Sequence, residues 1–340
     1  MAGDATVTGD DTEDVSKGLA AWLASELSSD ADLRIEGLHR TSSGFSRENW
    51  VFEASWLDDG RRVSEPLIAR RDPVGSVLET DRAVEFGLLH ALEGSALPTP
   101  RVRWLDADGQ WLQRPTIVMR REEGECDWFV LNGPRPLATR LSLAEQFCDV
   151  LIAIHQLDWR PLGLADVLGN PDPDPALAAL DHWESQLRRC QREPFPELEV
   201  VLAWLRSHAP TECHHPVLVH ADFKPGNALL QGDRVTFMLD WELAHLGDPV
   251  EDLGWITNPV RRREHQIPGV WERQQLIARY EQATGITVSD EALRWWNVLA
   301  NFKLSVIVLT GLAAFVEGRY DRAFQIPVGL FSVMFELIGA

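Results

Sequence analysis

The sequence predicts an α+β protein whose first part is rich in strands and whose second part is mainly helical. Up to Met119 the apolar residues fall into short runs between polar turns, a pattern typical of strands. From Ser142 onward they recur at helical spacing instead. One stretch, residues 217–255, interrupts the helical part with a predicted hairpin and carries the polar residues with the clearest chemistry.

The strand-rich part follows a tail and one helix. Residues up to about Glu13 are small, polar and acidic, and we expect them to be disordered. Residues 15–27 have the apolar spacing of an amphipathic helix. Beyond them the pattern predicts strands at residues 33–40, 49–56, 66–71 and 115–119, a hairpin made of residues 102–105 and 111–112, and a helix at residues 81–92.

In the helical part, Phe147, Leu151 and Ile154 line one face of the first helix. The same periodicity predicts helices at residues 178–192, 198–207, 271–283, 290–317 and 327–337. Asp248 is predicted to cap another short helix that begins at Pro249, and Asp252 on that helix is a candidate to hold the neighbouring loop.

The stretch from residue 217 to residue 255 suits phosphoryl transfer. A buried strand is predicted to lead into Asp222, Lys224 and Asn227, and the second arm of the next hairpin ends at Asp240. The carboxylate of Asp222 can accept the proton of an attacking hydroxyl, and Lys224 brings a positive charge to a transferring phosphate. Asn227 and Asp240 offer the hard oxygen ligands that Mg²⁺ prefers. The order of these residues is that of a kinase catalytic loop.

The motifs HADFKPGN and LDWELAHLGDPVEDLGW, which contain these residues, resemble the aminoglycoside phosphotransferase and choline kinase-like superfamily of small-molecule kinases. The subgroup with the strongest resemblance includes the kinase-like domains of acyl-CoA dehydrogenase family proteins. The resemblance implies a protein-kinase-like, two-lobed fold. It implies a β-rich nucleotide-binding lobe at residues 1–119, a hinge at residues 120–124, and a helical lobe with the catalytic loop and substrate site at residues 125–340.

The resemblance also implies where the nucleotide phosphates bind. It places them under a loop made of Ser43, Gly44, Phe45 and Ser46. Arg70 takes the strand position at which kinases have a lysine, because no lysine occurs between Lys17 and Lys224. An arginine keeps its charge and can grip phosphate with two N–H groups. Glu85 is the expected ion-pair partner of Arg70.

Adenine is expected near the backbone of Met119 and Arg121, at the hinge. ATP is the expected co-substrate, with GTP as the alternative, and Mg²⁺ is the expected cofactor. The candidate substrate contacts are Glu242, Arg261, Arg262 and Trp296. The arginine run at residues 261–263 lies in a predicted loop. It is interpreted either as a solvated run of charge or as a clamp for a phosphorylated or carboxylated substrate.

The acceptor is left open between a hydroxyacyl-CoA-like and an aminoglycoside-like compound. The many tryptophans and the arginine run favour the first, whereas an aminoglycoside would require carboxylates around it. A rival from another class is a nucleotide-binding pseudokinase that acts as a scaffold without transfer activity. Arg70 in place of lysine and a phosphate loop with one glycine keep this rival open, but the complete set of Asp222, Asn227 and Asp240 argues against it.

Composition adds expectations about compartment and partners. The formal net charge is -20, which argues against nucleic acid as a partner. The four cysteines are widely spaced, as free thiols of a reducing compartment are. We find no signal peptide, and the longest apolar run, residues 304–316, is too short to span a bilayer. We therefore expect a cytoplasmic protein that binds a nucleotide and a small molecule, without nucleic-acid or membrane partners.

Overall fold

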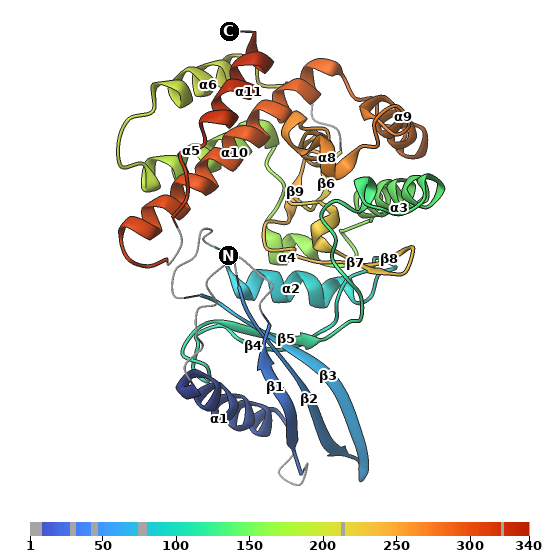
Figure 1. Cartoon of the computed structure of the whole chain (residues 1–340), viewed down its shortest axis with the longest axis vertical. Coiled ribbons are helices and arrows are strands. Elements are labelled where there is room, and N and C mark those ends of the chain that lie inside the picture. The colour runs from blue at the N-terminus through green and yellow to red at the C-terminus, as the bar shows by residue number, and fades with distance from the viewer. Residues whose placement is uncertain are drawn as a thin grey trace. The chain divides into compact units, whose positions relative to one another are not determined.

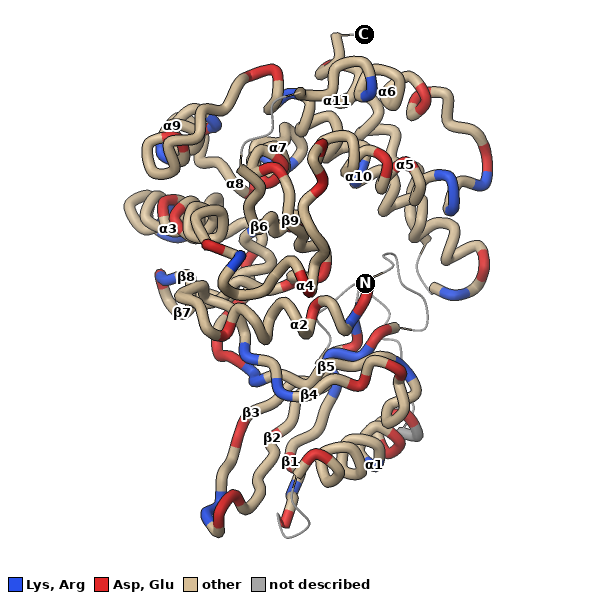
Figure 2. Tube along the Cα trace, turned by 180° about the vertical axis from the view of Figure 1, so that it is seen from behind, with Lys and Arg blue, Asp and Glu red and all other residues tan. Residues whose placement is uncertain are grey.

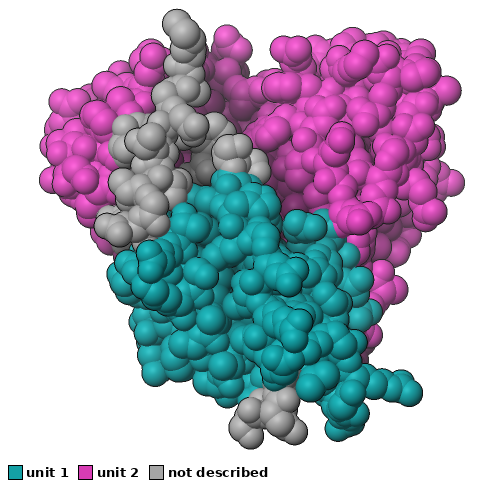
Figure 3. Space-filling model, turned by 60° about the horizontal axis from the view of Figure 1, so that its bottom comes forward, with its two compact units in different colours: residues 1–76, 81–90, 100–122 teal, residues 77–80, 91–99, 123–340 magenta. Residues whose placement is uncertain are grey.

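The computed structural model describes residues 9–27, 32–41, 47–73, 80–211, 215–320 and 323–339. The chain divides into two compact units, which Figure 3 shows in different colours. Unit 1 contains residues 1–76, 81–90 and 100–122, and unit 2 contains residues 77–80, 91–99 and 123–340. Figure 2 shows Asp and Glu residues on both units, consistent with the formal net charge of -20. The predicted phosphate loop, Ser43 to Ser46, lies outside the described residues.

Unit 1 is built on an antiparallel sheet with the strand order β1-β2-β3-β5-β4 (Figure 1). The strands are β1 (Arg34–Arg40), β2 (Glu48–Asp58), β3 (Arg61–Arg71), β4 (Val102–Asp106) and β5 (Thr116–Arg120). A helix, α2 (Arg82–Leu92), lies between β3 and β4 in the chain, and its last two residues belong to unit 2. These elements confirm the strands and the helix that the apolar pattern predicts in this part.

The prediction that residues 111–112 form the second strand of a hairpin is wrong. β4 pairs with β5 and not with residues 111–112, which belong to a turn. The carboxylate of Asp106 accepts backbone N–H bonds from Gln110 and Trp111, each at 2.8 Å. A carboxylate that satisfies several N–H groups stabilises a tight loop. The apolar pattern gives no sign of this side-chain role, which is why it suggests a strand here.

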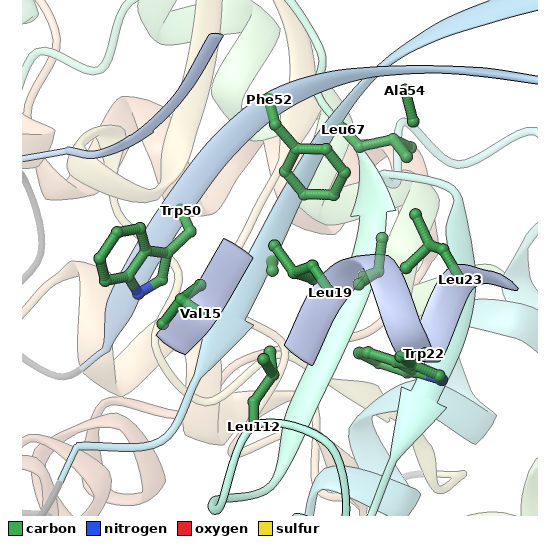
Figure 4. Packing of buried hydrophobic residues seen from close by; sticks show 11 residues of the cluster. Val15, Leu19, Trp22, Leu23, Trp50, Phe52, Ala54, Leu67 and Leu112 are labelled. Atoms are coloured by element: carbon green, nitrogen blue, oxygen red, sulfur yellow. The ribbon is translucent and has the colours of Figure 1, made fainter. Parts of the chain in front are cut away.

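The helix α1 (Gly9–Glu26) packs on one face of this sheet (Figure 4). The core between them contains Val15, Leu19, Trp22 and Leu23 from the helix and Trp50, Phe52, Ala54 and Leu67 from the strands. Residues 50, 52 and 54 share a face because strand side chains alternate. The helix includes residues 9–13, so the expectation that the tail is disordered through Glu13 is wrong for them; residues 1–8 lie outside the described residues.

Unit 2 is mainly helical. Its helices are α3 (Leu137–His155), α4 (Leu164–Leu168), α5 (Pro175–Cys190), α6 (Pro196–Ser207), α7 (Val250–Ile256), α8 (Arg262–His265), α9 (Arg273–Thr284), α10 (Asp290–Val316) and α11 (Val328–Ile338). Single 3-10 turns occur at η1 (Val130–Asn132), η2 (Pro225–Asn227) and η3 (Pro259–Arg261). Asp248 Oδ1 accepts the N–H of Val250 at 2.8 Å at the start of α7, but the helix begins at Val250 and its N-cap is Pro249, one residue later than predicted.

Two short strand pairs frame the polar stretch of unit 2. β6 (Val217–Val219) pairs with β9 (His245–Gly247), and β7 (Ala228–Gln231) pairs with β8 (Arg234–Met238). The β7–β8 pair is the predicted hairpin, and its turn residue Gly232 has a φ of 60°. Asp222 therefore follows β6, and Asp240 follows β8, as the sequence predicts.

The helix α10 is long and apolar and supplies much of the core of unit 2. Among the described residues it is the one helix whose length and composition would allow it to cross a membrane. Of its most apolar 18-residue window, 67% is buried inside the fold. A core helix has the same composition and the same burial, so this helix gives little support to a membrane span. Both Trp295 and Trp296 are 1% exposed.

Candidate active site

The loop after β6 is held by a buried carboxylate from α7. Asp252 is 0% exposed, and its two carboxylate oxygens accept the N–H groups of His220 and Ala221, each at 2.8 Å. Burial acts to raise the pKa of Asp252, but the hydrogen bonds from the His155 side chain and the His220 backbone act against it, and that pKa is lowered. Asp252 is therefore ionised at neutral pH. This confirms the prediction that Asp252 holds the loop after β6.

Ala221 and Asp240 both have left-handed backbones, with φ of 64° and 62°. This conformation costs a residue other than glycine about 1–2 kcal/mol, so the surrounding contacts must impose it. The two residues stand directly before Asp222 and directly after Leu239. Backbone strain thus occurs on both segments that carry the proposed catalytic and metal-binding groups.

His220 joins these two segments. Its Nδ1 lies 3.2 Å from the N–H of Asp222, and its Nε2 lies 3.0 Å from the carbonyl oxygen of Leu239. Nδ1 must accept and Nε2 must donate, which defines a neutral ring with its proton on Nε2. Complete burial lowers the pKa of His220 and favours this neutral form. The ring also packs on Trp241, with centroids 4.6 Å apart.

The carboxylate of Asp222 accepts two side-chain hydrogen bonds. Lys224 Nζ lies 2.5 Å from Asp222 Oδ2, and Asn227 Nδ2 lies 2.8 Å from the same oxygen. The side chain of Asp222 remains 18% exposed. Lys224 Nζ also lies 4.8 Å from the centre of the Trp128 ring. The site therefore presents an oriented carboxylate next to a fixed cation, which is the pair that transfer of a phosphoryl group to a hydroxyl requires.

The second pair of predicted residues is compatible with Mg²⁺. Asn227 uses its amide nitrogen on Asp222, and within the described residues its Oδ1 accepts no hydrogen bond. The carbonyl of Asn227 accepts the N–H of Leu239 at 2.7 Å, which ties Asn227 to the residue before Asp240. Mg²⁺ in nucleotide sites is held by one or two such side chains together with phosphates and water. An amide oxygen and a carboxylate are donors of this kind, so these residue types suit the cation.

A buried chain of polar residues continues from Asp252 into the helices of unit 2. His155 of α3 lies 3.1 Å from Asp252 through Nε2 and 2.7 Å from the hydroxyl of Tyr280 on α9 through Nδ1. Because a carboxylate only accepts, Nε2 carries a proton, and the Tyr280 hydroxyl donates to Nδ1 in the neutral ring. Burial raises the pKa of Tyr280 and keeps it a donor. The sequence does not predict that these two residues support Asp252; a histidine on the apolar face of a helix was the available signal.

In unit 1, Arg70 lies on the side of β3 that faces α2. Its Nη1 is 3.2 Å from Glu85 Oε1, which is the ion pair that the resemblance implies. Glu85 is also bound by Arg82, whose Nε lies 2.7 Å from Asp72. Arg71 points the other way, because strand side chains alternate, and its Nη2 lies 2.6 Å from Glu48. Met119 and Arg121 flank the end of β5, where the N–H of Arg121 bonds to Pro66.

The candidate substrate contacts differ in their positions. Arg261 is buried, pairs with Glu264 at 2.6 Å, and lies 4.3 Å from the ring of Trp255. It belongs to η3 and Arg262 begins α8, so the predicted loop at residues 261–263 is wrong. Arg262 is exposed and pairs with Glu272, and Glu242 is partly buried.

Trp296 is a core residue, and its prediction as a substrate contact is wrong. It is 1% exposed and packs so closely on α7 that a Cβ at Gly254 would lie 2.4 Å from the Cβ of Trp296. Burial of this extent places the indole in the core of unit 2. The helical periodicity that makes Trp296 apolar in the sequence reports packing here, as it does for Trp295.

A strand-rich unit with an Arg–Glu pair, and a helical unit with an Asp–Lys–Asn loop and a following Asp, are features of the kinase-like class of phosphotransferases. The chain belongs to the phosphotransferase enzyme family, whose family model matches residues 38–294. This match confirms the family that the motifs resemble.

Curated relatives agree with the predicted subgroup. The chain is 27% identical over 283 residues to acyl-CoA dehydrogenase family member 10 of Mus musculus, and the alignment covers 77% of this chain and 25% of that protein. It is 28% identical over 276 residues to acyl-CoA dehydrogenase family member 11 of Rattus norvegicus, which covers 76% of this chain and 34% of that protein. The matched region therefore spans about a quarter to a third of the length of these relatives.

Solved structures confirm the kinase-like fold. A protein from Ralstonia eutropha assigned as an aminoglycoside phosphotransferase has a TM-score of 0.72 at 20% identity, over 95% of this chain and 98% of the other. A thermostable variant of aminoglycoside phosphotransferase APH(4)-Ia, solved with AMP-PNP and hygromycin B, has a TM-score of 0.58 at 19% identity, again over 95% and 98%. At this identity the likeness defines the fold.

Proposed function

We propose that this protein transfers the γ-phosphate of ATP to a hydroxyl group of a small molecule, with Mg²⁺ as cofactor. The observation that carries the proposal is the geometry of Asp222, whose carboxylate is held by Lys224 and Asn227 at 2.5 and 2.8 Å on a loop pinned by Asp252. Membership of the phosphotransferase family supports the same class of reaction.

In this proposal Asp222 orients the acceptor hydroxyl and takes its proton as the bond to phosphorus forms. Lys224 stabilises the negative charge of the phosphoryl group in transit. Asn227 Oδ1 and the carboxylate of Asp240 would hold Mg²⁺, which when bound neutralises charge on the phosphate oxygens. Such a division of roles requires no covalent intermediate on the protein.

The nucleotide roles belong mainly to residues of unit 1. Arg70, oriented by Glu85, is proposed to hold the α- and β-phosphates, and the loop from Ser43 to Ser46 is proposed to cover them. Backbone groups near Met119 and Arg121 are proposed to contact adenine. The solved relative with AMP-PNP supports ATP as the nucleotide, and GTP remains the alternative to be tested beside it.

For the acceptor we favour a hydroxyacyl-CoA-like compound over an aminoglycoside-like one. Acyl-CoA dehydrogenase relatives share the matched region, which supports the first class. The buried Arg261 and the exposed Arg262 are proposed to meet the anionic part of such an acceptor. Because APH(4)-Ia was solved with hygromycin B, aminoglycoside-like acceptors are tested as well.

The experiment measures ADP release by the purified chain with ATP or GTP, with and without Mg²⁺, over a panel of hydroxyacyl-CoA and aminoglycoside compounds. Mass spectrometry of each acceptor then detects a gain of one phosphate. We expect one class of acceptor to be phosphorylated in a Mg²⁺-dependent reaction. Tight nucleotide binding without transfer to any acceptor would instead support the pseudokinase.

A further inference from the structure

Lys303 is a buried lysine whose surroundings belong to no assigned role. It is one of three lysines in the chain and lies in the middle of α10, where it is 4% exposed. Its Nζ lies 4.7 Å from the centre of the Trp255 ring and 5.3 Å from that of Trp183. Lysine is almost never buried unless it has a partner, so this position requires an explanation.

The partner of Lys303 is the backbone of the catalytic loop. Its ammonium donates a hydrogen bond to the carbonyl oxygen of Ala221, which belongs to the peptide group that joins Ala221 to Asp222. The N–H of that same peptide group is bound by His220 Nδ1 at 3.2 Å. Both polar ends of one peptide plane are therefore held by side chains, and the carboxylate of Asp222 extends from the next Cα atom.

Ala221 is the residue at which this support matters most. Its φ of 64° is a conformation that alanine rarely adopts. Asp252 binds its N–H at 2.8 Å, and Lys303 binds its carbonyl oxygen. If either contact were lost, the backbone would be free to relax toward a negative φ, which would rotate the peptide plane before Asp222.

The electrostatic surroundings explain why an ammonium is tolerated here. Burial lowers the pKa of Lys303, and the negative charges of Glu251, Asp222 and Asp252 oppose that effect. Two tryptophan rings face the cation, and such rings attract ammonium groups. The lysine thus replaces water with aromatic faces and one backbone acceptor, an arrangement suited to a fixed contact.

We propose that Lys303 is a positioning residue that holds the Ala221–Asp222 peptide and thereby orients the carboxylate of Asp222. This inference rests on the proposed phosphotransfer for its effect on rate, but its structural part does not depend on that activity. Lys303 acts through Ala221 and touches neither nucleotide nor metal in this role.

The test compares Lys303→Met with Leu309→Ala, a cavity-forming control on the same helix that is 3% exposed in the wild type. Hydrogen exchange by mass spectrometry follows the peptide over residues 217–227, and MgATP hydrolysis with water as the acceptor follows the rate. For Lys303→Met we expect at least about tenfold faster exchange at this peptide and a kcat lower by about 10–100-fold, because a small misplacement of a catalytic group has effects of that size. The KM for ATP should stay unchanged. The control should lower the melting temperature with neither effect.

Unchanged exchange in Lys303→Met, or an equal increase in the control, would overturn the inference. Absence of ATP turnover in the wild type would count against the proposed function alone, because the exchange measurement still decides the role of Lys303. If the variants fail to fold, a measurement on the wild-type protein tests the inference instead. With ¹⁵N-lysine the chain has three side-chain signals, and we expect that of Lys303 to exchange slowly with water. A rapidly exchanging signal would contradict the hydrogen bond to Ala221.

Discussion

Lys224 Nζ lies 2.5 Å from Asp222 Oδ2, so the proposed base and the proposed phosphate-binding cation are in direct contact. Because the protein already holds this carboxylate in one orientation, no free energy is needed to orient it in the transition state. The contact also means that each of the two groups partly neutralises the other. Removing one group therefore changes the charge around the other.

Asp222→Asn should fold and bind MgATP but lose phosphoryl transfer. The amide keeps an oxygen that can accept from Lys224, yet it cannot take the proton of the acceptor. We expect at least about a 100-fold lower kcat, the usual share of a general base. Asp233→Asn, at an exposed side chain in the turn of the β7–β8 hairpin, is the matched control and should keep full activity. Turnover above about a tenth of the wild-type value would refute the assignment of Asp222.

Asp240→Ala should weaken nucleotide binding mainly when Mg²⁺ is present. The carboxylate is proposed to reach the phosphates only through the cation, so binding of metal-free ATP should change little. Isothermal calorimetry with Mg²⁺ and with EDTA separates the two conditions. An equal loss of affinity in both would rule out Asp240 as a metal ligand.

Gly226→Ala should disturb Lys224 through Trp128. A Cβ on Gly226 would lie 2.6 Å from Cε2 of the Trp128 ring, so the ring must move, and Lys224 would lose the aromatic face that lies 4.8 Å from its Nζ. A contact of this kind contributes about 0.5–2 kcal/mol, and we therefore expect a kcat lower by up to about tenfold.

A double-mutant cycle with Trp128→Ala checks the route of this effect. Once the ring is absent, the added methyl group has nothing to displace, so Gly226→Ala should cause little further loss. Full additivity of the two substitutions would show that Gly226 acts on the loop by another route.

The proposed catalytic groups could be predicted from the sequence because they are close together in the chain. Asp222, Lys224 and Asn227 lie on one loop, and one hairpin brings Asp240 to the segment bonded to Asn227. The strands of unit 1 followed from apolar alternation for a similar local reason. Arg70 and Glu85 required the family resemblance, since a strand residue and a helix residue do not indicate their pairing by spacing alone.

The supporting groups were not accessible in this way. His155, Tyr280 and Lys303 reach the loop from α3, α9 and α10, so their roles depend on how distant helices pack. Trp296 shows the opposite error, because a large aromatic residue on a long helix suits a core and a binding wall equally well until its neighbours are known. A polar residue on an otherwise apolar helix face is the more informative signal.

His220 should make the protein less stable as the pH falls below about 6.5, the ordinary pKa of histidine. Burial lowers the pKa of His220 in the folded state, so the unfolded chain binds more protons in that range. The free energy of unfolding therefore decreases as the pH falls. His265, whose pKa is lowered well below its usual value, acts in the same direction, whereas the raised pKa of His245 acts oppositely.

Comparison of His220→Gln with the wild type isolates one contribution, because the other histidines are common to both. Urea unfolding at pH 7.5 and pH 5.5 should show a smaller loss of stability for the variant than for the wild type. Equal losses would mean that His220 does not contribute to the pH dependence.

Arg70 and Arg71 give a pair of neighbouring arginines with opposite expected effects. Arg70→Ala should raise the KM for ATP and lower kcat, because Arg70 is proposed to hold the α- and β-phosphates. The fold should persist, since Glu85 keeps its bond to Arg82. Arg70→Lys should recover only part of the loss, because lysine supplies the charge without the planar fork of donors.

Arg71→Ala is the matched control on the same strand. Its guanidinium bonds to Glu48 and Asp11 and lies 5.7 Å from the centre of the Trp50 ring, so its loss removes contacts that connect β3 to β2 and α1. Burial acts to raise the pKa of Glu48, and hydrogen bonds from Arg114 and Arg71 lower it; without Arg71 this carboxylate loses part of its stabilisation. We expect a lower melting temperature with an unchanged KM for ATP. A raised KM in Arg71→Ala beside a normal KM in Arg70→Ala would assign the phosphate contact to Arg71.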